Sequence, residues 1–516
     1  MTATPLGDLP LVHANRKSAD ALAIIYPEEC LTWAELARRV NRRARLYQSL
    51  GVGRNDFVTL ALPNGPAFHE ALFAIWKLGA TPNILSSRLP IHEFLSILKM
   101  VNPRLVIGGP DKGASLEGWR QIAGGTALHD FDDAPMPSEV AQSWRAMATG
   151  GSTGLPRVIV ERKPAEIDLD SLASQPVIGL NANDVLLNPG PLYHAAPFLS
   201  THMTLFLGAS VIGMVRFDAE EVLRLISRHR VTMMTLVPTM MRRIWALPKE
   251  VRDRYDVSSL RMVWHFAAPC PPWLKEAWID WLGPDRIWEL YGGSESIGAA
   301  VISGREWLAK RGSVGRLTGG GSVKVIANDG GECPAGEVGE LYFKGAGGTP
   351  NTDYLGVEVK SLGEGWYSYG DLGHVDSDGY IFLADRRVDL ILRGGANIYP
   401  AEIEAAIEAH PEVECAVIVG LPCEDLGQRV HAIVKPSPGT HPTAHDLTRF
   451  LVGRIAAFKL PESYEFSEAQ LRDDAGKVRR SALRDERAGW LRDGVLFQQF
   501  VRREGPSIVP HAKTFE

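Results

Sequence analysis

The sequence predicts an α/β protein with a large N-terminal domain and a small α+β domain at its C-terminus. Three observations lead to this prediction. Helix-like and strand-like segments alternate over much of the chain, short strands with Gly-rich turns follow Gly319, and a compact helix–strand unit follows Asp389. Such alternation favours parallel sheets covered by helices. We place the domain boundary near Arg386–Asp389, which divides the chain into residues 1–386 and 387–516.

Hydrophobic periodicity indicates the elements of the first domain. Residues 31–50 have apolar side chains at helical spacing, with Thr32 as N-cap and Glu35 where a capping box places it. The same alternation continues as a strand in 51–65, a helix over 66–80 that ends at Gly79, and a helix–strand–helix run over 220–247. This order is typical of α/β proteins with parallel sheets.

The chain changes character after Gly319. Short strands joined by Asp-Gly and Gly-Gly turns lie in 322–345 and 370–387, and they predict antiparallel hairpins or a small barrel. Beyond Asp389, a helix, two strands and a further helix lie within 400–458. They predict a compact α+β unit of common domain size.

Composition limits the classes of function. The 516 residues carry a formal net charge of -6 and no run of Lys and Arg, which argues against nucleic acid as a partner. No stretch approaches the roughly 18–20 apolar residues of a membrane span. The N-terminus also lacks the pattern of a secretory signal. The 5 cysteines are scattered and fit a reducing compartment. We therefore expect a cytoplasmic protein without a membrane span.

The stretch MATGGSTGLPR, Met147–Arg157, is predicted to be a loop that binds an anion. Glycine permits unusual backbone angles, so that N–H groups and hydroxyls can approach a phosphate closely. The stretch lacks the Gly-Lys-Ser/Thr ending of a P-loop and the glycine spacing of a dinucleotide fingerprint. By composition alone, a flexible surface turn fits it equally well.

Further short motifs follow along the chain. They are PLYHAAP at 191–197, YGGSE at 291–295, YGDLG at 369–373, DRRVDLILRGGANIYPAEIE at 385–404 and DDAGKVRRSAL at 473–483. Taken singly, their His, Glu, Asp and Lys residues fit ordinary core or surface positions. Together with the Gly-rich loop, and in this order, they resemble the motifs of the ATP-dependent adenylate-forming superfamily. That superfamily contains acyl-CoA synthetases, adenylation domains of peptide synthetases and luciferases, and the resemblance covers most of the chain.

The resemblance implies a fold and a reaction. The large domain would contain stacked α/β sheets and a small β-barrel subdomain, and the small domain would be a mobile lid. The enzyme would use ATP, Mg²⁺ and coenzyme A to convert a carboxylic acid first to an acyl-adenylate and then to a thioester. The acid, ATP and CoA would be its small-molecule partners, and a homodimer is left open.

The resemblance also implies roles for single residues. Tyr291 would lie against the adenine, Asp371 and Arg386 would contact the ribose, and Glu295 would ligate Mg²⁺ through its carboxylate. Lys477 would reach the active site during adenylation, and the catalytic group would be Lys477, Glu295 and His194. The full ATP- and AMP-binding set would be Thr149, Gly150, Gly151, Ser152, Thr153, Gly154, Arg157, Tyr291, Gly292, Ser294, Asp371 and Arg386.

The remaining implied sites concern the acid and the thiol. The acyl pocket would be lined by His194, Thr239, Ala267 and Ala268, with His194 also as a gate. Gly394 and Gly395 would line the CoA tunnel, where backbone must pass close to a thin ligand. Val388 falls at the hinge between the domains.

Three positions depart from the superfamily pattern. Arg157 replaces a lysine, and the planar guanidinium is not equivalent to a point ammonium. Val388 stands where an Asp or Lys hinge is usual, which leaves the efficiency of the second step open. Ala267-Ala268-Pro269 replaces Gly-Gly-Ala and adds two methyl groups between acyl pocket and adenine.

Stretches outside the ATP motifs bear on the acid. VPTMMRRIWAL, GREWLAKRGSVGR and the segment that leads into YGGSE resemble bile-acid CoA ligases and similar enzymes for bulky polycyclic acids. A steroid-like or terpenoid carboxylate is therefore expected, with aromatic or medium-chain acids as the alternative. Two other hypotheses stay open: an adenylation-only enzyme that passes acyl-AMP to a carrier protein or partner ligase, and a non-catalytic binding relative.

Overall fold

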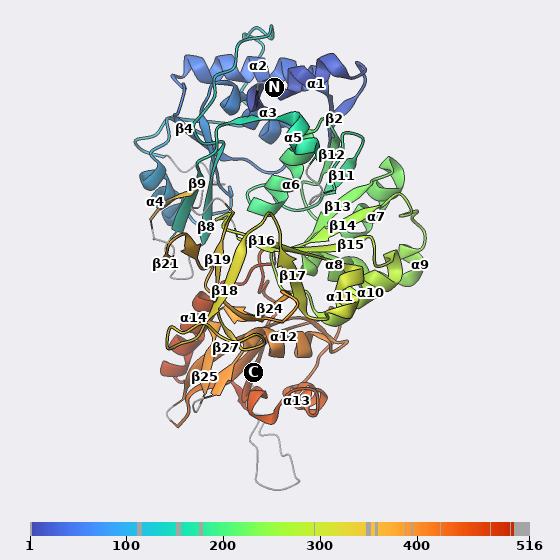
Figure 1. Cartoon of the computed structure of the whole chain (residues 1–516), viewed down its shortest axis with the longest axis vertical. Helices are drawn as coiled ribbons and strands as arrows, with labels where there is room; N and C mark the ends of the chain where they lie inside the picture. Colours follow the sequence, from blue (N-terminus) through green and yellow to red (C-terminus); the bar gives the residue numbers. More distant parts are fainter. Residues whose placement is uncertain are drawn as a thin grey trace.

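The structure is a computed structural model, and its sheets and helices fall into a large upper part and a small lower part (Figure 1). It describes residues 3–110, 116–150, 156–174, 179–293, 295–346, 352–356, 360–386, 389–393, 396–423, 425–474, 476–495 and 497–499.

Two mainly parallel sheets form the core of the large part. The first runs in the order β3 (Cys30–Thr32), β2 (Leu22–Ile25), β12 (Ser210–Gly213), β11 (Val185–Asn188), β13 (Met233–Leu236), β14 (Met262–His265), β15 (Ile287–Gly292) and β16 (Ala299–Ser303). The second runs in the order β20 (Thr352–Leu355), β9 (Pro156–Glu161), β8 (Arg145–Gly150), β5 (Thr81–Ile84), β4 (Phe57–Ala61), β6 (Leu105–Gly108) and β7 (Gln121–Ile122). A short pair of β1 (Thr4–Pro5) and β10 (Glu166–Ile167) lies apart from both.

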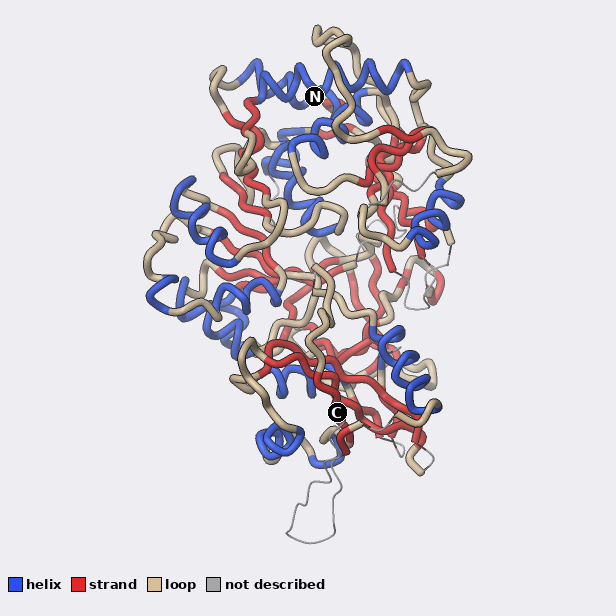
Figure 2. The backbone as a smooth tube through the Cα atoms, turned by 180° about the vertical axis from the view of Figure 1, so that it is seen from behind, coloured by secondary structure: helices blue, strands red, loops and turns tan. Residues whose placement is uncertain are grey.

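Helices cover these sheets. In the views from the front and from behind, α7, α9 and α10 lie on the outer side of the first sheet (Figures 1 and 2). The buried face of α3 includes Phe68, Phe73 and Trp76, which join the main hydrophobic core. The helices are α1 (Leu9–Arg16), α2 (Trp33–Ser49), α3 (Pro66–Lys77), α4 (Ile91–Val101), α5 (Leu169–Ser174), α6 (Ala195–Phe206), α7 (Ala219–His229), α8 (Pro238–Trp245), α9 (Lys249–Arg252), α10 (Pro272–Leu282) and α11 (Gly304–Ala309). None of the described helices is long and apolar enough to cross a membrane.

Antiparallel strands continue the first sheet beyond β16, and those after Gly319 form the kind of hairpins that the Gly-rich turns predict. They are β17 (Ser313–Leu317), β24 (Ile381–Arg386), β23 (Asp371–Val375), β19 (Gly339–Lys344), β22 (Trp366–Tyr367) and β21 (Ser361–Gly363), with β18 (Ser322–Ile326) paired to β19. Their inner side chains form a separate small core around Leu341 and Phe343.

The small part has its own sheet and core. The sheet runs β26 (Ala396–Ile398), β25 (Ile391–Arg393), β28 (Gly427–Pro436), β29 (Ser463–Phe466) and β30 (Gln498–Gln499), with β27 (Val413–Cys423) paired to β28. Helices α12 (Pro400–Glu408), α13 (Ala444–Leu451) and α14 (Arg480–Arg492) pack around it. The boundary proposed near Arg386–Asp389 lies between β24 and β25. This mixed architecture confirms the predicted fold class.

Local sequence signals explain several of these elements. Thr32 accepts a hydrogen bond from the Glu35 N–H and caps α2, as predicted. The loop expected over Met147–Arg157 is shorter than predicted. Strand β8 continues through Gly150 and β9 begins at Pro156, with Thr149 opposite Arg157. Antiparallel pairing between the two strands satisfies backbone groups that the Gly- and Thr-rich composition suggested would lie in a loop.

Candidate active site

Four predicted site residues lie along one edge of the first sheet. Strands β11, β13, β14 and β15 are adjacent and parallel, so their carboxyl ends meet at the same edge. His194 follows β11, Thr239 follows β13, Ala267 follows β14, and Tyr291 lies near the end of β15. Ligands of open α/β sheets bind at such carboxyl edges. The edge therefore brings together parts of the predicted acyl and adenine sites.

Ala267 adopts an unusual backbone conformation at this edge. Its φ is 71°, a left-handed value that glycine adopts without strain and alanine does not. The side chain of Ala267 is exposed, and that of its neighbour Ala268 is partly buried. The substitution of alanine for the expected glycine thus places a methyl group, and backbone strain, beside the predicted pocket.

Arg157 and Glu295 form an ion pair across the second and first sheets. Arg157 Nη1 lies 3.5 Å from Glu295 Oε1, and the two side chains are 17% and 15% exposed. The Nε of Arg157 is buried and has no hydrogen-bond partner among the described residues. The guanidinium therefore keeps donor capacity for an anion. The backbone of Thr149 and Gly150 lies opposite in β8, whereas Gly151, Ser152, Thr153 and Gly154 lie outside the described residues.

The turn before Glu295 has no room for a side chain. A Cβ on Gly293 would lie 2.3 Å from Tyr369 Cε1 and 2.5 Å from Glu295 Oε2. The Tyr369 hydroxyl accepts hydrogen bonds from the N–H groups of Ile297 and Gly298, both at 3.1 Å. Burial raises the pKa of this phenol. The sequence reasoning gave Tyr369 no role, although its place at the start of YGDLG was a signal for it.

Tyr291 and Asp371 meet through a short hydrogen bond. The Tyr291 hydroxyl donates to Asp371 Oδ2 at 2.6 Å. Asp371 begins β23 and lies opposite Arg386 of β24, so the two residues predicted to contact the ribose share one pair of strands. Gly292 is exposed at the end of β15. The ribose contacts themselves stay predictions.

These groups suit a nucleotide phosphate with a divalent cation. The carboxylate of Glu295 offers the hard oxygen ligand that Mg²⁺ prefers, and its pair with Arg157 is longer than a charge-assisted hydrogen bond. The buried Nε of Arg157 provides a donor for a phosphate oxygen. Glu295 would hold the metal and Arg157 the phosphate.

The Lys477 loop of the small domain lies against the large domain. Gly476 has a φ of 75°, and a Cβ there would lie 3.3 Å from Thr239 Oγ1 and 3.8 Å from Val237 Cγ2. The loop is braced internally, because the Lys477 N–H donates to Asp473 Oδ1 and the Asp473 N–H donates to the Lys477 carbonyl, both at 2.9 Å. The predicted catalytic lysine thus lies next to the predicted acyl pocket.

His194 lies at the same contact. It precedes α6 as its N-cap residue, and its Nε2 lies 3.9 Å from Asp473 Oδ2. Burial, and then the charge of Lys477, lower the pKa of His194 to about 3. The imidazole is therefore neutral near pH 7. The ring of Tyr193 lies 4.6 Å away.

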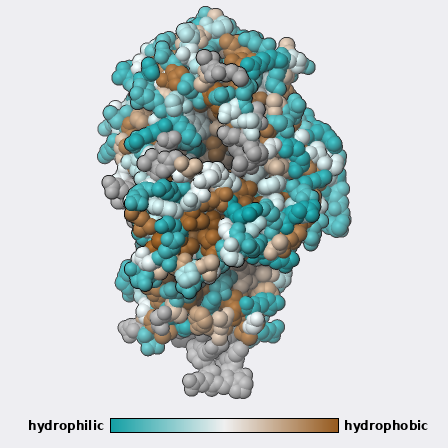
Figure 3. Space-filling view, viewed as in Figure 1, coloured by the Kyte–Doolittle hydropathy of each residue, from teal (hydrophilic) through white to brown (hydrophobic). Residues whose placement is uncertain are grey.

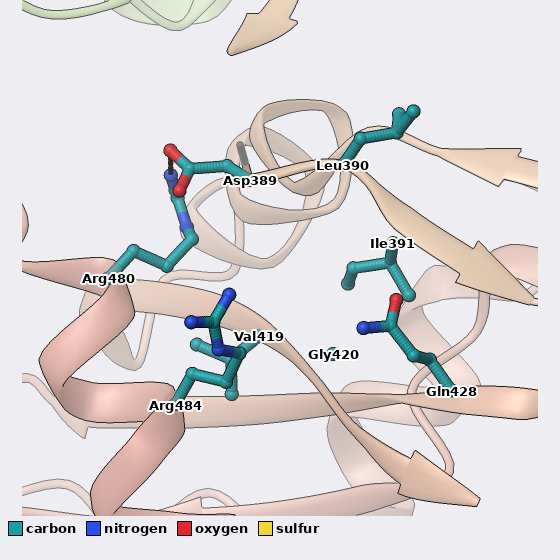
Figure 4. A pocket seen from close by; sticks show the side chains of 8 residues that line it. All are labelled: Asp389, Leu390, Ile391, Val419, Gly420, Gln428, Arg480 and Arg484. Carbon is teal, nitrogen blue, oxygen red and sulfur yellow. Dashed lines mark hydrogen bonds and ion pairs between the residues drawn. The ribbon is translucent and has the colours of Figure 1, made fainter. Parts of the chain in front are cut away.

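Some predicted residues lie outside the described part of the chain: Ser294, Val388, Gly394 and Gly395. Their roles stay predictions. Asp389, just beyond the predicted hinge, is described. Its carboxylate pairs with Arg480 at 2.7 Å, beside a shallow pocket of the small domain (Figure 4). The pocket is lined by Asp389, Leu390, Ile391, Val419, Gly420, Gln428, Arg480 and Arg484.

The face of the molecule shown in Figure 3 is not uniformly polar. On the face shown in Figure 3, apolar residues gather across the middle of the molecule, while hydrophilic residues dominate its margins.

Known proteins are similar to this chain over nearly its whole length. Residues 11–351 match the model of the AMP-binding enzyme family, and residues 402–477 match that of the AMP-binding enzyme C-terminal domain. A fatty acid–[acyl-carrier-protein] ligase of Streptomyces coeruleorubidus is 32% identical over 489 residues, covering 90% of this chain and 93% of that protein. A feruloyl-CoA synthase of Amycolatopsis sp is 32% identical over 497 residues, covering 93% and 98%.

A solved structure shares the fold. The o-succinylbenzoate coenzyme A synthetase of Bacillus subtilis, in complex with ATP and magnesium ion, superposes with a TM-score of 0.77 at 26% identity. The match covers 93% of this chain and 100% of that one.

Proposed function

Because the chain belongs to the AMP-binding enzyme family, we propose that it is an AMP-forming ligase that joins a hydrophobic carboxylic acid to coenzyme A. ATP and Mg²⁺ serve the first of its two steps. The observation that carries the proposal is the contact of the Lys477 loop with Thr239 and His194, at the sheet edge that also carries Tyr291.

In the first step, a carboxylate oxygen of the acid attacks the α-phosphorus of ATP. The bond from that phosphorus to the bridging oxygen breaks, and pyrophosphate leaves. Acids of this kind ionise with pKa values of about 4–5, so no general base is required near pH 7. The difficulty is the approach of two anions. The chain meets it with the cations Arg157 and Lys477, by position and charge.

Each group has a separate task in this step. Glu295 would hold Mg²⁺, which when bound would supply positive charge against the phosphate oxygens. Arg157 binds phosphate through its free donor, and Asp371 with Tyr291 orients the nucleoside. His194 is neutral, so it shapes the pocket without adding charge next to Lys477.

In the second step, the thiol sulfur of coenzyme A attacks the acyl carbon of the adenylate. The bond from that carbon to the phosphate oxygen breaks, the thiol proton goes to solvent, and AMP leaves. The small domain would act as a lid that withdraws Lys477 between the steps and turns Gly394 and Gly395 towards the thiol, with Val388 as the pivot.

For the acid, we propose a bulky hydrophobic carboxylate, with steroid-like and terpenoid acids as the first candidates. Several residues near the edge carry only a methyl group: Ala195 and Ala196 in the first turn of α6, and Ala267 and Ala268 after β14. Small side chains there support a wide pocket. Aromatic acids are the alternative, since the similar Amycolatopsis protein is a feruloyl-CoA synthase. We propose the cytoplasm as the location, and a homodimer stays open.

The test is a panel assay. The enzyme, ATP and Mg²⁺ are incubated with steroid, terpenoid, aromatic and fatty acids, with and without coenzyme A, and pyrophosphate, AMP and acyl-CoA are measured. We expect pyrophosphate with a bulky acid and acyl-CoA when the thiol is added. Glu295→Gln should abolish both products, whereas exposed Glu337→Gln should not. No turnover with any acid would refute the proposal.

A second candidate is transfer of the acyl group to a carrier protein. It is favoured by the 32% identity to a fatty acid–[acyl-carrier-protein] ligase. The same panel separates the two, because this enzyme would release pyrophosphate without forming acyl-CoA. Addition of a phosphopantetheinylated carrier protein would then restore thioester formation.

A further inference from the structure

Two ion pairs join the domains on either side of Lys477. Arg88 Nη1 of the large domain lies 2.7 Å from Asp474 Oδ2, just before the lysine. Arg479 Nη1, just after the lysine, lies 2.8 Å from Glu93 Oε1 of the large domain. The order of charges along the chain is opposite in the two segments: the large domain presents Arg88 and then Glu93, whereas the small domain presents Asp474 and then Arg479. If one segment ran the other way, Arg88 would face Arg479 and Glu93 would face Asp474, so like charges would meet.

The large-domain partners lie on firmly placed elements. Arg88 follows β5, and its N–H donates to Ser86 Oγ at 3.1 Å. Glu93 lies in the first turn of α4, whose Phe94 and Leu98 are fully buried. The backbone that carries the two charges is therefore placed by contacts within the large domain itself.

The small-domain partners are braced as well. Asp474 follows Asp473, whose backbone and carboxylate hold the Lys477 loop closed. Arg479 precedes Arg480, which pairs with Asp389 at 2.7 Å (Figure 4) and with Glu404 at 2.5 Å. Asp474 and Arg479 thus place one charge on each side of Lys477 in the sequence.

We propose that the two ion pairs, Arg88–Asp474 and Glu93–Arg479, together form a lysine dock. The dock positions Lys477 at the sheet edge beside the predicted acyl pocket. The four residues are positioning residues. The step that the lysine serves rests on the proposed function, whereas the dock itself does not. The paired side chains are 66% and 44% exposed in the first pair and 65% and 24% in the second. Exposed pairs attract weakly, so the dock specifies orientation and still releases the lid.

The main test is charge reversal and exchange. Arg88→Asp places two carboxylates together, and Arg88→Asp with Asp474→Arg restores the pair in the opposite sense. We expect the single change to slow pyrophosphate release about three- to twenty-fold and the double change to recover most of it. Thiolation of supplied acyl-AMP should not slow. The defect should shrink in high salt, because exposed charges are screened.

A matched control tests whether the slower pyrophosphate release depends on the position of the reversed charge or on any change of surface charge. Arg305 and Asp285 form an ion pair of 2.6 Å within the large domain, 68% and 69% exposed. Arg305→Asp should leave both half-reactions unchanged. An Arg88→Asp enzyme as active as this control, or a double variant no better than the single one, would overturn the dock.

A readout without turnover distinguishes the dock from the proposed function. Gly476 is buried against Thr239, so hydrogen exchange of peptides spanning 473–479 reports docking. We expect faster exchange in Arg88→Asp, recovery in the double variant and no change in Arg305→Asp. If no acid is activated but exchange responds in this way, the proposed function fails and the dock stands. If acids are activated but exchange is unchanged, the dock fails alone.

Discussion

Replacing Arg157 tests the site where the chain departs most from the superfamily pattern. Arg157 Nη1 lies 3.5 Å from Glu295 Oε1, and its buried Nε has no partner among the described residues. Arg157→Gln removes the charge and keeps a polar side chain. Arg157→Lys keeps the charge but replaces the planar fork by a single ammonium group. The pair of variants separates the need for charge from the need for geometry.

The magnitude follows from the contacts that each variant loses. A hydrogen bond to a charged group contributes about 1.5–3 kcal/mol, and 1.36 kcal/mol corresponds to about ten-fold in rate. Arg157→Gln should therefore lower kcat/KM for ATP about 10- to 150-fold. Arg157→Lys, which keeps the attraction but loses the second donor, should lose about three- to ten-fold. Glu295 also loses its cation in Arg157→Gln, so the Mg²⁺ concentration for half-maximal activity should fall.

The assay is pyrophosphate release as ATP and Mg²⁺ are titrated separately. Arg162→Gln serves as the control, because Arg162 directly follows the same strand, is 63% exposed and pairs with Asp353 rather than with Glu295. It should leave both titrations unchanged. A wild-type kcat/KM for ATP in Arg157→Gln, or an Arg157→Lys enzyme as impaired as Arg157→Gln, would contradict the role of Arg157 in phosphate binding.

Three further predictions concern the lysine, the strained alanine and the buried histidines. Lys477→Ala should slow acyl-AMP formation by about two orders of magnitude or more and spare thiolation of supplied acyl-AMP, measured as separate half-reactions; unchanged adenylation would contradict the role of the lysine. Ala267→Gly should raise the urea midpoint of unfolding, because relief of about 1–2 kcal/mol of left-handed backbone strain exceeds the cost of about 0.4–1 kcal/mol from the extra entropy of the unfolded chain. Ala268 has no positive φ, so Ala268→Gly should lower the midpoint. Equal effects of the two substitutions would contradict this prediction. Burial lowers the pKa of several histidines below the unfolded value near 6.5, so as the pH falls from about 6.5 to about 4 the unfolded chain binds more protons and stability falls; a urea midpoint that is the same at pH 5 as at pH 7.5 would contradict it. Among these histidines, His13 and His265 have pKa values of about 4, and His69 and His194 have pKa values of about 3.

Much of the fold could be predicted because its signals are local. The cap formed by Thr32 and Glu35, and the turn glycine Gly79 after α3, depend on a few neighbouring residues. Strand β8 could not be predicted in the same way. Its last residues, Thr149 and Gly150, have loop-like composition, and only pairing with β9 makes them a strand. Strand formation depends on a partner that local composition does not reveal.

For the candidate site, too, the features that could be predicted are the local ones. Residues within motifs, such as Glu295, Asp371 and Lys477, could be proposed from the sequence, because each lies in a short pattern. The partners that surround the lysine could not. Arg88 and Asp474 are 386 residues apart, as are Glu93 and Arg479. Exposed charged residues occur throughout a chain of this composition, and only the folded arrangement selects these four.

Two ion pairs of the described residues differ in a way that supports a site whose charges exchange partners. Arg145 and Glu161 lie 2.7 Å apart and are each 6% exposed, so separating them would leave a buried charge unpaired at a large cost. Arg157 and Glu295 lie 3.5 Å apart with more exposure, and each group still has capacity for a further partner. Their separation costs less, and phosphate and Mg²⁺ can compensate both charges at once. Before the nucleotide binds, Arg157 and Glu295 thus hold each other in place and keep the site ordered. Binding of phosphate and Mg²⁺ then requires separation of this weaker pair only, and not of a buried pair such as Arg145–Glu161.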